Sequence, residues 1–192
     1  MEGEVSVLYS ASVIQARVRE LGKAIARDYN GREPVLVSVL KGGVMFLADL
    51  FRAIEKHVLI DFMSISPYGP QGTGVVRIMK DLDLDIMGQD VIVVEDIVDT
   101  GLTLSYLLSV LQAREPASLA VCALLDKSAR RIAPLELPYR GFDCPDRFVV
   151  GYGLDYAQRY RNLPFILSVP DPTALADDPG LLLPYLDRVG RT

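Results

Sequence analysis

The sequence predicts an α/β protein with a mostly parallel central sheet flanked by helices. Short apolar, β-branched runs alternate with stretches of helical periodicity, which is typical of a parallel sheet covered on both faces. Several of these runs are followed by polar or glycine-rich turns, and the carboxyl ends of parallel strands meet at one edge of a sheet. The 192 residues, 50% of them hydrophobic, are enough to bury a single core.

The first helix is predicted over residues 12–30. Four apolar residues recur on one helical face: Ile14, Val18, Leu21 and Ile25. Ser12 followed by Gln15 matches the capping box that begins many helices, and Asn30 with Gly31 ends the pattern. This helix therefore has one face for the core.

A strand, a turn and a helix are predicted next. The apolar run at residues 34–40 predicts a buried strand, and the Lys-Gly-Gly turn at residues 41–43 leads into a helix over residues 44–56. By itself, a glycine pair after a strand is more often an ordinary tight turn, but Lys41 beside it favours binding of phosphate. A further strand is predicted over residues 57–64.

Residues 66–74 contain two prolines and three glycines, a composition that predicts a mobile loop or lid that cannot continue a sheet. A β-like run at residues 75–79 makes this loop the expected tip of a long hairpin. Further strands are predicted over residues 117–125 and 148–152. From Pro170 onward, prolines interrupt any long helix, although enough apolar residues remain for the tail to pack.

The most informative stretch is residues 91–104, which read VIVVEDIVDTGLTL. The apolar run at residues 91–94 predicts a strand buried on both faces, with the acids Glu95 and Asp96 at its carboxyl end. The turn at residues 99–103 then leads into a predicted helix. Open α/β sheets bind their ligands at such strand ends.

The turn at residues 99–103 offers a site for an anion such as phosphate. It presents backbone N–H groups at the start of the helix predicted over residues 102–114, and Gly101 lets a ligand approach the backbone closely. The hydroxyl groups of its two threonines add donors. By itself, however, Asp99 in this turn is best interpreted as a helix N-cap.

Composition argues against several classes of partner. With 20 basic and 25 acidic residues the net charge is −5, so a nucleic-acid backbone is not expected as the main partner. We find no stretch long enough to span a membrane and no signal peptide. Cys122 and Cys144 lack the spacing of a zinc site and are expected to be reduced thiols in the cytoplasm.

Four segments together resemble the type I phosphoribosyltransferases, and within them the 6-oxopurine (hypoxanthine-guanine) branch. The segment EDIVDTGLT at residues 95–103 is similar to the family's phosphoribosyl-pyrophosphate motif. Three further matches in the right order point to the purine branch: LKGG at 40–43, LLDK at 124–127 and FVVGYGLDYAQRYR at 148–161. The resemblance covers roughly residues 8–166.

The resemblance implies a role for each matching position. The residues implied to bind phosphoribosyl pyrophosphate are Glu95, Asp96, Asp99, Thr100, Gly101, Leu102, Thr103, Leu40, Lys41, Gly42 and Arg161, with Asp99 as general base and a cis peptide between Leu40 and Lys41. Those implied at the purine are Lys127, which would donate to the 6-oxo group, Phe148, which would stack on the base, Val149 and Asp155. Mg²⁺ is the implied cofactor, held by Glu95, Asp96 and Asp155. The implied lid contains Pro67 and Tyr68, although relatives commonly have serine or alanine before this tyrosine.

The resemblance also implies an architecture. Residues 1–170 would form one phosphoribosyltransferase domain, with a small hood subdomain built from the N-terminal segment and the part after about residue 130, and a mobile hairpin lid. Residues 171–192 would be a C-terminal extension packed on the domain or at a subunit interface. We expect a homodimer or homotetramer whose ligands are a purine base and phosphoribosyl pyrophosphate, without nucleic-acid or membrane partners.

The implied function is purine salvage in the cytoplasm. The enzyme would transfer the 5-phosphoribosyl group from phosphoribosyl pyrophosphate to hypoxanthine or guanine, giving IMP or GMP and pyrophosphate. One alternative is a sister enzyme that prefers xanthine. Another is a regulatory effector-binding protein with the same fold, although the sequence shows no added helix-turn-helix stretch and retains Asp99, Lys127 and Arg161.

Overall fold

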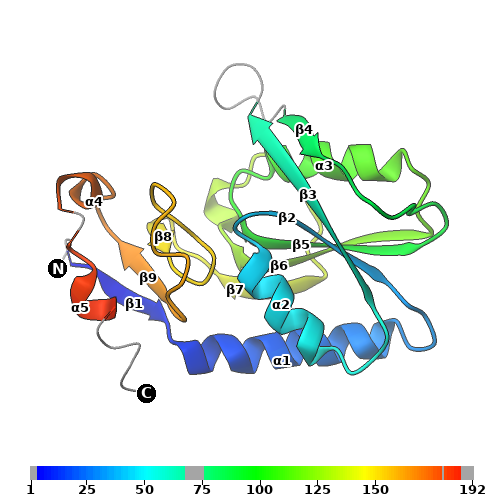
Figure 1. Ribbon diagram of the computed structural model, residues 1–192, viewed down its shortest axis with the longest axis horizontal. Helices are drawn as coiled ribbons and strands as arrows, with labels where there is room; N and C mark the ends of the chain where they lie inside the picture. The colour runs from blue at the N-terminus through cyan, green and yellow to red at the C-terminus, as the bar shows by residue number, and fades with distance from the viewer. Residues whose placement is uncertain (1–3, 68–75, 179, 187–192) are drawn as a thin grey trace.

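The computed structural model describes residues 4–67, 76–178 and 180–186. A large sheet with helices on both faces forms one part of the molecule, and a smaller sheet lies beyond one end of it (Figure 1). Among the described residues, no helix combines the length and the apolar character needed to cross a membrane. The predicted lid residue Tyr68 lies outside the described residues, as does most of the predicted loop 66–74.

The main sheet has six strands in the order β4-β3-β2-β5-β6-β7, which confirms the predicted α/β fold with a mostly parallel sheet. Five strands are parallel, and β4 at one edge is antiparallel to β3. The strands are β2 (Val35–Leu40), β3 (Leu59–Pro67), β4 (Val76–Lys80), β5 (Asp90–Val98), β6 (Ser118–Asp126) and β7 (Tyr139–Asp143). The strand β7 was not predicted from the sequence.

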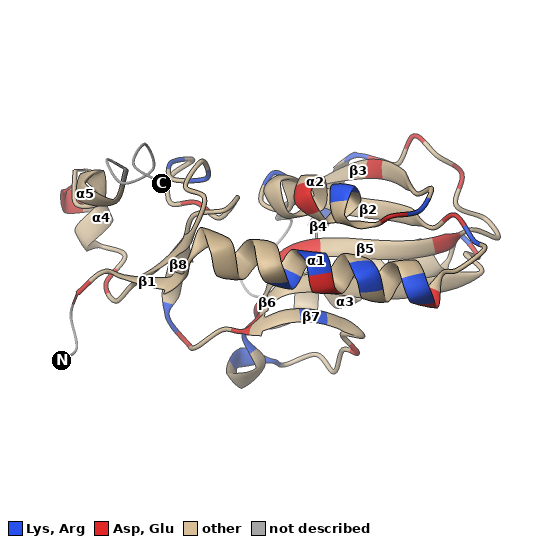
Figure 2. Ribbon diagram, turned by 90° about the horizontal axis from the view of Figure 1, so that it is seen from below, with Lys and Arg blue, Asp and Glu red and all other residues tan. Residues whose placement is uncertain are grey.

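Three helices cover the main sheet: α1 (Ala11–Asp28), α2 (Val44–Ala53) and α3 (Leu102–Gln112). Side chains of β5 alternate between the two faces, so Ile92 packs with α1 and α2, whereas Val91 packs with α3. Both residues are fully buried. Along α1, basic and acidic residues are interspersed (Figure 2), as expected for a helix with one face toward solvent.

Helix α1 begins earlier than predicted, which corrects the expected cap. Its N-cap is Ser10, whose hydroxyl accepts a hydrogen bond from the backbone N–H of Val13 at 3.4 Å. The predicted cap Ser12 therefore lies inside the first turn. Arg17 of the same helix donates to the carbonyls of Arg140 at 2.7 Å and Gly141 at 3.0 Å, so it satisfies acceptors of the edge strand β7.

The antiparallel pairing of β3 with β4 confirms the predicted hairpin, but the strand is longer than expected. Ser66 and Pro67 pair with Arg77 and Val76, so the segment assigned to the loop begins inside the sheet. Pairing of β3 with β2 ends at Ser64. Beyond Ser64, β3 is paired only with β4 in the described structure, and a strand paired on one side can contain a proline.

The smaller sheet, here called the hood sheet, is antiparallel in the order β1-β9-β8. Its strands are β1 (Ser6–Tyr9), β8 (Phe148–Val150) and β9 (Ile166–Val169), and neither β1 nor β9 was predicted. The short helices α4 (Ala174–Asp177) and α5 (Leu183–Leu186) pack on it through buried Leu175 of α4, buried Leu182 just before α5, and partly buried Tyr185. The hydroxyl of Tyr185 donates to the Val5 carbonyl at 2.6 Å, which ties the tail to the start of β1.

Candidate active site

The carboxyl ends of β5 and β6 meet at one edge of the main sheet. Val98 pairs with Asp126 in the parallel ladder, and the backbone N–H of Lys127 donates to the Val98 carbonyl at 2.9 Å. The turn that begins at Asp99 and the end of β6 are therefore held side by side. This edge brings together two of the polar turns that the sequence placed after strands.

Glu95 and Asp96 lie within β5 rather than after it, because β5 remains paired with β6 as far as Val98. Successive residues of a strand face opposite sides of the sheet, so the two carboxylates diverge. Glu95 lines a cleft together with Asp99. Asp96 faces the turn after β2, where a Cβ added to Gly42 would lie 1.9 Å from its Oδ2.

Both carboxyl groups of this pair resist ionisation. Burial, assisted by the charge of Asp96, raises the pKa of Glu95 well above its usual range. Burial also raises the pKa of Asp96 to about 6, against the opposing effect of the N–H groups of Ile97 and its own residue. Among the described residues, no lysine or arginine forms an ion pair with either group. A bound cation would therefore stabilise their charged forms.

The cleft beside β5 has a volume of about 220 Å³ and includes the turn 99–103. Gly101 is the N-cap of α3 and has φ +80°, a left-handed conformation that glycine adopts without strain. An added Cβ would also lie 2.8 Å from Leu135 Cδ1. Thr100 Oγ1 accepts a hydrogen bond from Leu102 N at 3.4 Å, and Thr103 lines the same cleft.

Asp99 does not cap helix α3, which corrects the interpretation that its position alone favoured. One oxygen, Oδ2, forms an ion pair with Arg130 at 3.1 Å. The other, Oδ1, is buried and has no hydrogen-bond partner among the described residues. A buried acceptor without a partner is costly, so this oxygen is available for a ligand donor.

Two residues that were not predicted from the sequence, Arg131 and Asp126, support this turn. Arg131 forms a short ion pair with Asp126, and both side chains are largely buried. Its guanidinium also donates to the carbonyl of Asp99 at 3.1 Å and to that of Val98 at 3.3 Å. The pair fixes the backbone just before the turn. The only sequence signal was an arginine a few residues after a strand end, which by itself is unspecific.

Lys127 and Phe148 approach the site from different sheets. Lys127 follows β6 and is 6% exposed, and its ammonium group makes no hydrogen bond or ion pair within the part of the chain that the structure describes. Phe148 begins β8 of the hood sheet, and its ring meets that of Tyr156 edge to face, with centroids 5.8 Å apart. Val149 is buried beside it.

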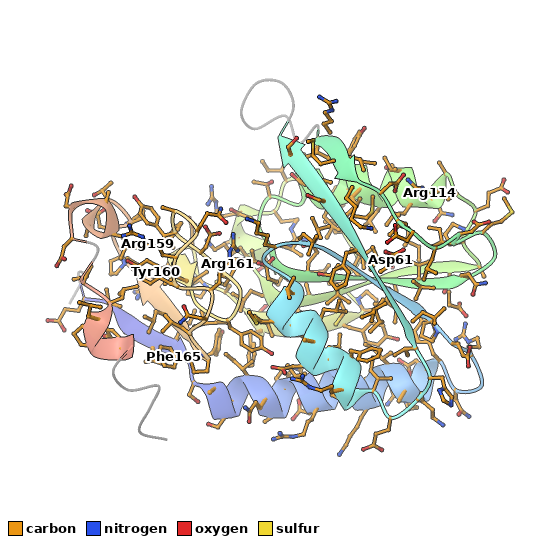
Figure 3. All side chains as sticks on the ribbon, viewed as in Figure 1. Asp61, Arg114, Arg159, Tyr160, Arg161 and Phe165 are labelled. Carbon is orange, nitrogen blue, oxygen red and sulfur yellow. The ribbon has the colours of Figure 1, made fainter. Side chains whose placement is uncertain are left out.

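The loop over residues 151–161, here called the hood loop, packs against the turn after β2. Gly153 has φ +99°, and a Cβ there would lie 2.1 Å from the carbonyl oxygen of Gly42. Arg161, labelled in Figure 3, donates to the Gly153 carbonyl at 2.6 Å and forms an ion pair with Asp155 at 2.7 Å. The peptide between Leu40 and Lys41, which lies just before Gly42 in the turn after β2, is cis as expected.

Gln158 was not recognised from the sequence, although it bridges these two segments. Its side-chain oxygen accepts from Lys41 Nζ at 3.3 Å and from Arg161 Nη2 at 3.4 Å. Gln158 and Tyr160 have positive φ, which is uncommon for residues other than glycine and concentrates at functional sites. A single polar residue in a loop gives no sequence signal for such a bridge.

Within the described ranges, no group of three or more carboxylate, histidine or cysteine side chains is arranged to hold a metal ion. Asp155 therefore does not join Glu95 and Asp96 in a complete protein site. Its carboxylate is instead engaged by Arg161 and by the backbone N–H of Gln158 at 2.8 Å. A metal ion at this edge would need further oxygen ligands, from a substrate or from water.

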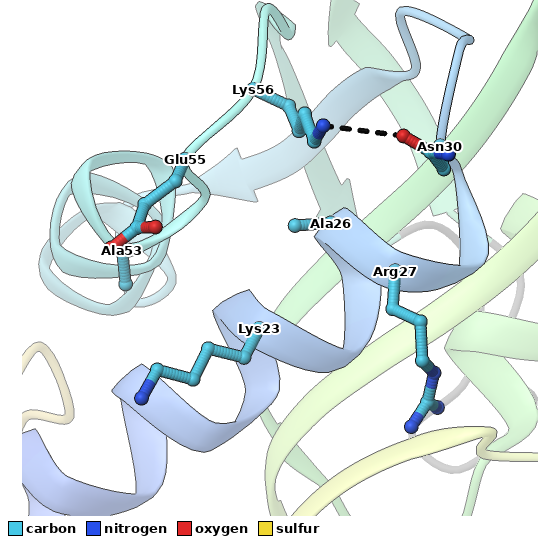
Figure 4. Close-up of a pocket in the computed structure, with 7 residues that line it drawn as sticks. All are labelled: Lys23, Ala26, Arg27, Asn30, Ala53, Glu55 and Lys56. Carbon is cyan, nitrogen blue, oxygen red and sulfur yellow. Dashed lines mark hydrogen bonds between the residues drawn. The ribbon is translucent and has the colours of Figure 1, made fainter.

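A larger hollow, of about 420 Å³, lies between α1 and α2 and does not share the residues described above (Figure 4). Its cationic residues Lys23 and Arg27 point in different directions in that view, and Lys56 donates to Asn30 Oδ1 at 3.2 Å. Volume alone would select this hollow. The smaller cleft is the better candidate because its polar groups converge.

Comparison with known proteins gives consistent matches. A model described as the phosphoribosyl transferase domain matches residues 5–157. Over 169 residues the chain is 52% identical to a hypoxanthine-guanine phosphoribosyltransferase of Mycobacterium avium, covering 84% of this chain and 83% of that protein. Over 173 residues it is 49% identical to a hypoxanthine phosphoribosyltransferase of Escherichia coli K12, covering 88% and 97%. A crystal structure of a hypoxanthine-guanine phosphoribosyltransferase from Bacillus anthracis matches with a TM-score of 0.83 and 50% identity, covering 85% of this chain and 98% of that one.

Proposed function

This chain belongs to the phosphoribosyltransferase family, and from that premise we propose that it is a magnesium-dependent hypoxanthine-guanine phosphoribosyltransferase of purine salvage. It transfers the 5-phosphoribosyl group from phosphoribosyl pyrophosphate to hypoxanthine or guanine and releases pyrophosphate. The relatives named above are called hypoxanthine-guanine phosphoribosyltransferase and hypoxanthine phosphoribosyltransferase, and their similarity extends over most of this chain.

One observation carries the proposed mechanism. Asp99 places a buried oxygen, without a hydrogen-bond partner among the described residues, at the turn of residues 99–103, and Gly101 rather than Asp99 caps the helix. Oδ1 is thus available to a ligand, while Oδ2 stays paired with Arg130. As the purine nitrogen bonds to the anomeric carbon, Asp99 accepts the proton that the ring loses, which is general-base catalysis worth typically about 10²–10⁴-fold.

The sugar phosphate fits the cleft beside β5. We assign the 5′-phosphate to the turn of Asp99, Thr100, Gly101, Leu102 and Thr103, where N–H groups and hydroxyls meet an anion at a helix start. We assign the ribose hydroxyls to Glu95 and Asp96. Because the sugar gains positive charge as its bond to pyrophosphate breaks, nearby carboxylates stabilise the transition state electrostatically.

The chemistry of the carboxylate pair fits Mg²⁺. Glu95 and Asp96 have raised pKa values and form no ion pair with a lysine or arginine among the described residues, so a divalent ion would stabilise their charged forms. Magnesium is usually bound by one or two carboxylates together with substrate phosphates, so a third protein ligand is not needed. When bound, it would neutralise charge on the pyrophosphate leaving group. Asp155 would act near the ion.

The pyrophosphate is assigned to the contact between the turn after β2 and the hood loop. Leu40, Lys41 and Gly42 supply the turn, and Arg161 supplies a guanidinium whose Nε is buried without a partner in the described structure. Lys41 and Arg161 meet through Gln158. Two cations beside a backbone turn are suited to a multiply charged leaving group.

The purine is assigned to the space between the end of β6 and the hood sheet. Lys127 donates to the 6-oxo group, Phe148 stacks on the ring, and the backbone of Val149 and Asp155 meets the opposite edge of the base. The largely buried side chain of Lys127 supports this assignment, because its ammonium group makes no hydrogen bond or ion pair to the described residues and so is free to donate to a ligand. Pro67 and Tyr68 would belong to a lid that excludes water.

Steady-state assays with phosphoribosyl pyrophosphate, Mg²⁺ and four bases test the proposal. We expect turnover with hypoxanthine and guanine. A clear preference for xanthine would replace the substrate assignment with the sister enzyme. Absence of turnover with every base, combined with binding of RNA or DNA in a gel-shift assay, would favour the regulatory protein of the same fold.

We further propose one domain over residues 1–170, with the hood sheet as its hood, in a homodimer or homotetramer located in the cytoplasm. The packing of α4 and α5 on the hood sheet supports an extension, residues 171–192, that rests on its own domain. Cys122 and Cys144 are free and buried, as a reducing compartment would keep them. Sedimentation analysis measures the subunit number.

A further inference from the structure

We propose that Gln158 is a positioning residue that holds Lys41 and Arg161 together for pyrophosphate without cancelling their positive charges. The inference rests on the proposed function, because that function assigns pyrophosphate to these two cations. Gln158 itself need not touch the ligand. Its contribution is to bring a cation of the turn after β2 and a cation of the hood loop to a common acceptor.

The contacts of the Gln158 side chain support this role. Its Oε1 accepts hydrogen bonds from Lys41 Nζ at 3.3 Å and from Arg161 Nη2 at 3.4 Å. Both donors carry a full positive charge, and two such groups repel each other when they are close. A shared acceptor offsets that repulsion, so the pair is assembled before an anion arrives.

The chemical type of the acceptor matters as much as its position. Arg161 already has an acidic partner in Asp155 at 2.7 Å, whereas Lys41 has none among the described residues. The cluster of Lys41, Arg161 and Asp155 therefore has two positive charges and one negative charge. A carboxylate at position 158 would cancel the remaining charge, whereas an amide holds both cations and leaves the cluster positive toward pyrophosphate.

The backbone of the hood loop aims this amide. Gln158 has φ +66°, in the left-handed region, and its N–H donates to Asp155 Oδ2 at 2.8 Å. The neighbouring Ala157 and Tyr160 also have positive φ, at +50° and +73°. Several residues with positive φ in one loop are held in that conformation by the surrounding structure, and backbone of this kind is concentrated at functional sites. Asp155 thus holds the loop through both Arg161 and the Gln158 backbone.

Two substitutions separate the side chain from the backbone. Gln158→Asn favours the left-handed conformation more than glutamine does, but it is one methylene shorter and cannot reach both cations. Gln158→Glu keeps the length and adds a charge. Arg159→Gln is the matched control, since Arg159 lies in the same loop but is exposed and is labelled on the side of Arg161 away from the main sheet in Figure 3.

The measurements are steady-state kinetics for phosphoribosyl pyrophosphate, calorimetric binding of magnesium pyrophosphate and of GMP, and thermal unfolding. We expect Gln158→Asn to raise the KM for phosphoribosyl pyrophosphate and the Kd for pyrophosphate by about three- to tenfold, with the larger effect for Gln158→Glu. Binding of GMP, which lacks the pyrophosphate group, should change by less than twofold. Arg159→Gln should behave like the wild type.

Three outcomes would overturn the inference. Wild-type pyrophosphate binding in Gln158→Asn would show that the bridge does not position the cations. Tighter binding in Gln158→Glu would show that neutrality of the acceptor is unimportant. Equal losses for pyrophosphate and GMP, together with a lower Tm, would indicate a purely structural role. Failure of the proposed function would look different, because the wild-type protein itself would then lack both turnover and pyrophosphate binding.

Discussion

The main sheet and the hood sheet contribute to the same site but place their residues in different ways. In the main sheet, Asp99 and Lys127 each follow a parallel strand directly, and the neighbouring strand fixes them through the contact of Lys127 N with the Val98 carbonyl. In the hood sheet, Phe148 belongs to a three-residue strand, and Arg161 lies in a loop with several positive φ values. Local structure positions the first pair, whereas packing between distant segments positions the second.

From this difference we expect residues of the main sheet and residues of the hood to serve different functions in catalysis. Groups at the ends of main-sheet strands are held firmly enough to act on the reacting atoms, where small displacements are costly. Groups on the hood are aligned with the main sheet by contacts between segments that are distant in sequence, among them the close approach of Gly153 to Gly42. Substitutions in the main sheet should therefore change chemistry, and substitutions in the hood should change alignment or stability.

The largest effect is expected for Asp99→Asn. The amide keeps the shape of the side chain but cannot accept a proton, so kcat should fall by about 10²–10⁴-fold. Binding of phosphoribosyl pyrophosphate, measured by calorimetry, should change little. Near-normal turnover would show that Asp99 is not the general base. The proposal that residues at the ends of main-sheet strands carry out the proton transfer would then be wrong.

The choice of base gives the next largest effect. Lys127 has only donors, so it pairs with a 6-oxo group but finds no acceptor on the 6-amino group of adenine. Leaving this buried group unpaired costs about 1–3 kcal/mol or more, which corresponds to roughly 5- to 150-fold in kcat/KM. Competition assays with guanine and adenine measure the ratio. Comparable values for the two bases would contradict the role of Lys127.

Gly153→Ala tests the contact between hood and main sheet. The new Cβ would lie 2.1 Å from the Gly42 carbonyl oxygen, so the hood loop must shift, and kcat/KM for phosphoribosyl pyrophosphate should fall about tenfold. Gly88→Ala is the matched control, because Gly88 also has positive φ, +69°, but open space around it. It should cost about 1–2 kcal/mol of stability from backbone strain alone and leave kinetics unchanged. Similar kinetics for the two variants would refute an alignment role.

The smallest effect on activity is expected for Tyr185→Phe. Loss of its hydrogen bond to the Val5 carbonyl should lower the free energy of unfolding by about 1 kcal/mol, or about 2–4 °C in Tm. Turnover should stay at the wild-type value, since the contact lies on the far side of the hood sheet from the main sheet. Tyr106→Phe, at an exposed position of α3, serves as a control for loss of a hydroxyl.

The contrast between the main sheet and the hood sheet also explains which strands and turns could be predicted from the sequence. The strands β2 and β6 were predictable because each is a contiguous apolar run, and the turn at Gly101 was predictable because its residue types are specific for a phosphate-binding helix start. The strands β1 and β9 have only four residues each. They are stabilised by pairing between segments that are distant in sequence, so no local pattern predicts them. For the same reason β7, which reads YRGFD, was missed.

Side-chain partners were less predictable than strands. Glu95 and Asp96 are adjacent in the sequence, and only the continuation of β5 to Val98 shows that they face opposite sides of the sheet. The support that Arg131 gives to the Asp99 backbone, and the bridge formed by Gln158, depend on distances between remote segments. Neither could be inferred from spacing along the chain.

The pairing of Ser6 with Ser168 also sets the order of events during protein synthesis. The ribosome synthesises β1 first. Its partner β9 emerges only after the whole of the chain between them has been synthesised. At translation rates of about 5–20 residues per second, β1 waits on the order of 10–30 s, while the main sheet can already pair strand by strand. Until β9 arrives, the nascent chain has the turn of residues 99–103 but no complete hood sheet, so the contact to which we assign pyrophosphate is among the last parts of the protein to form.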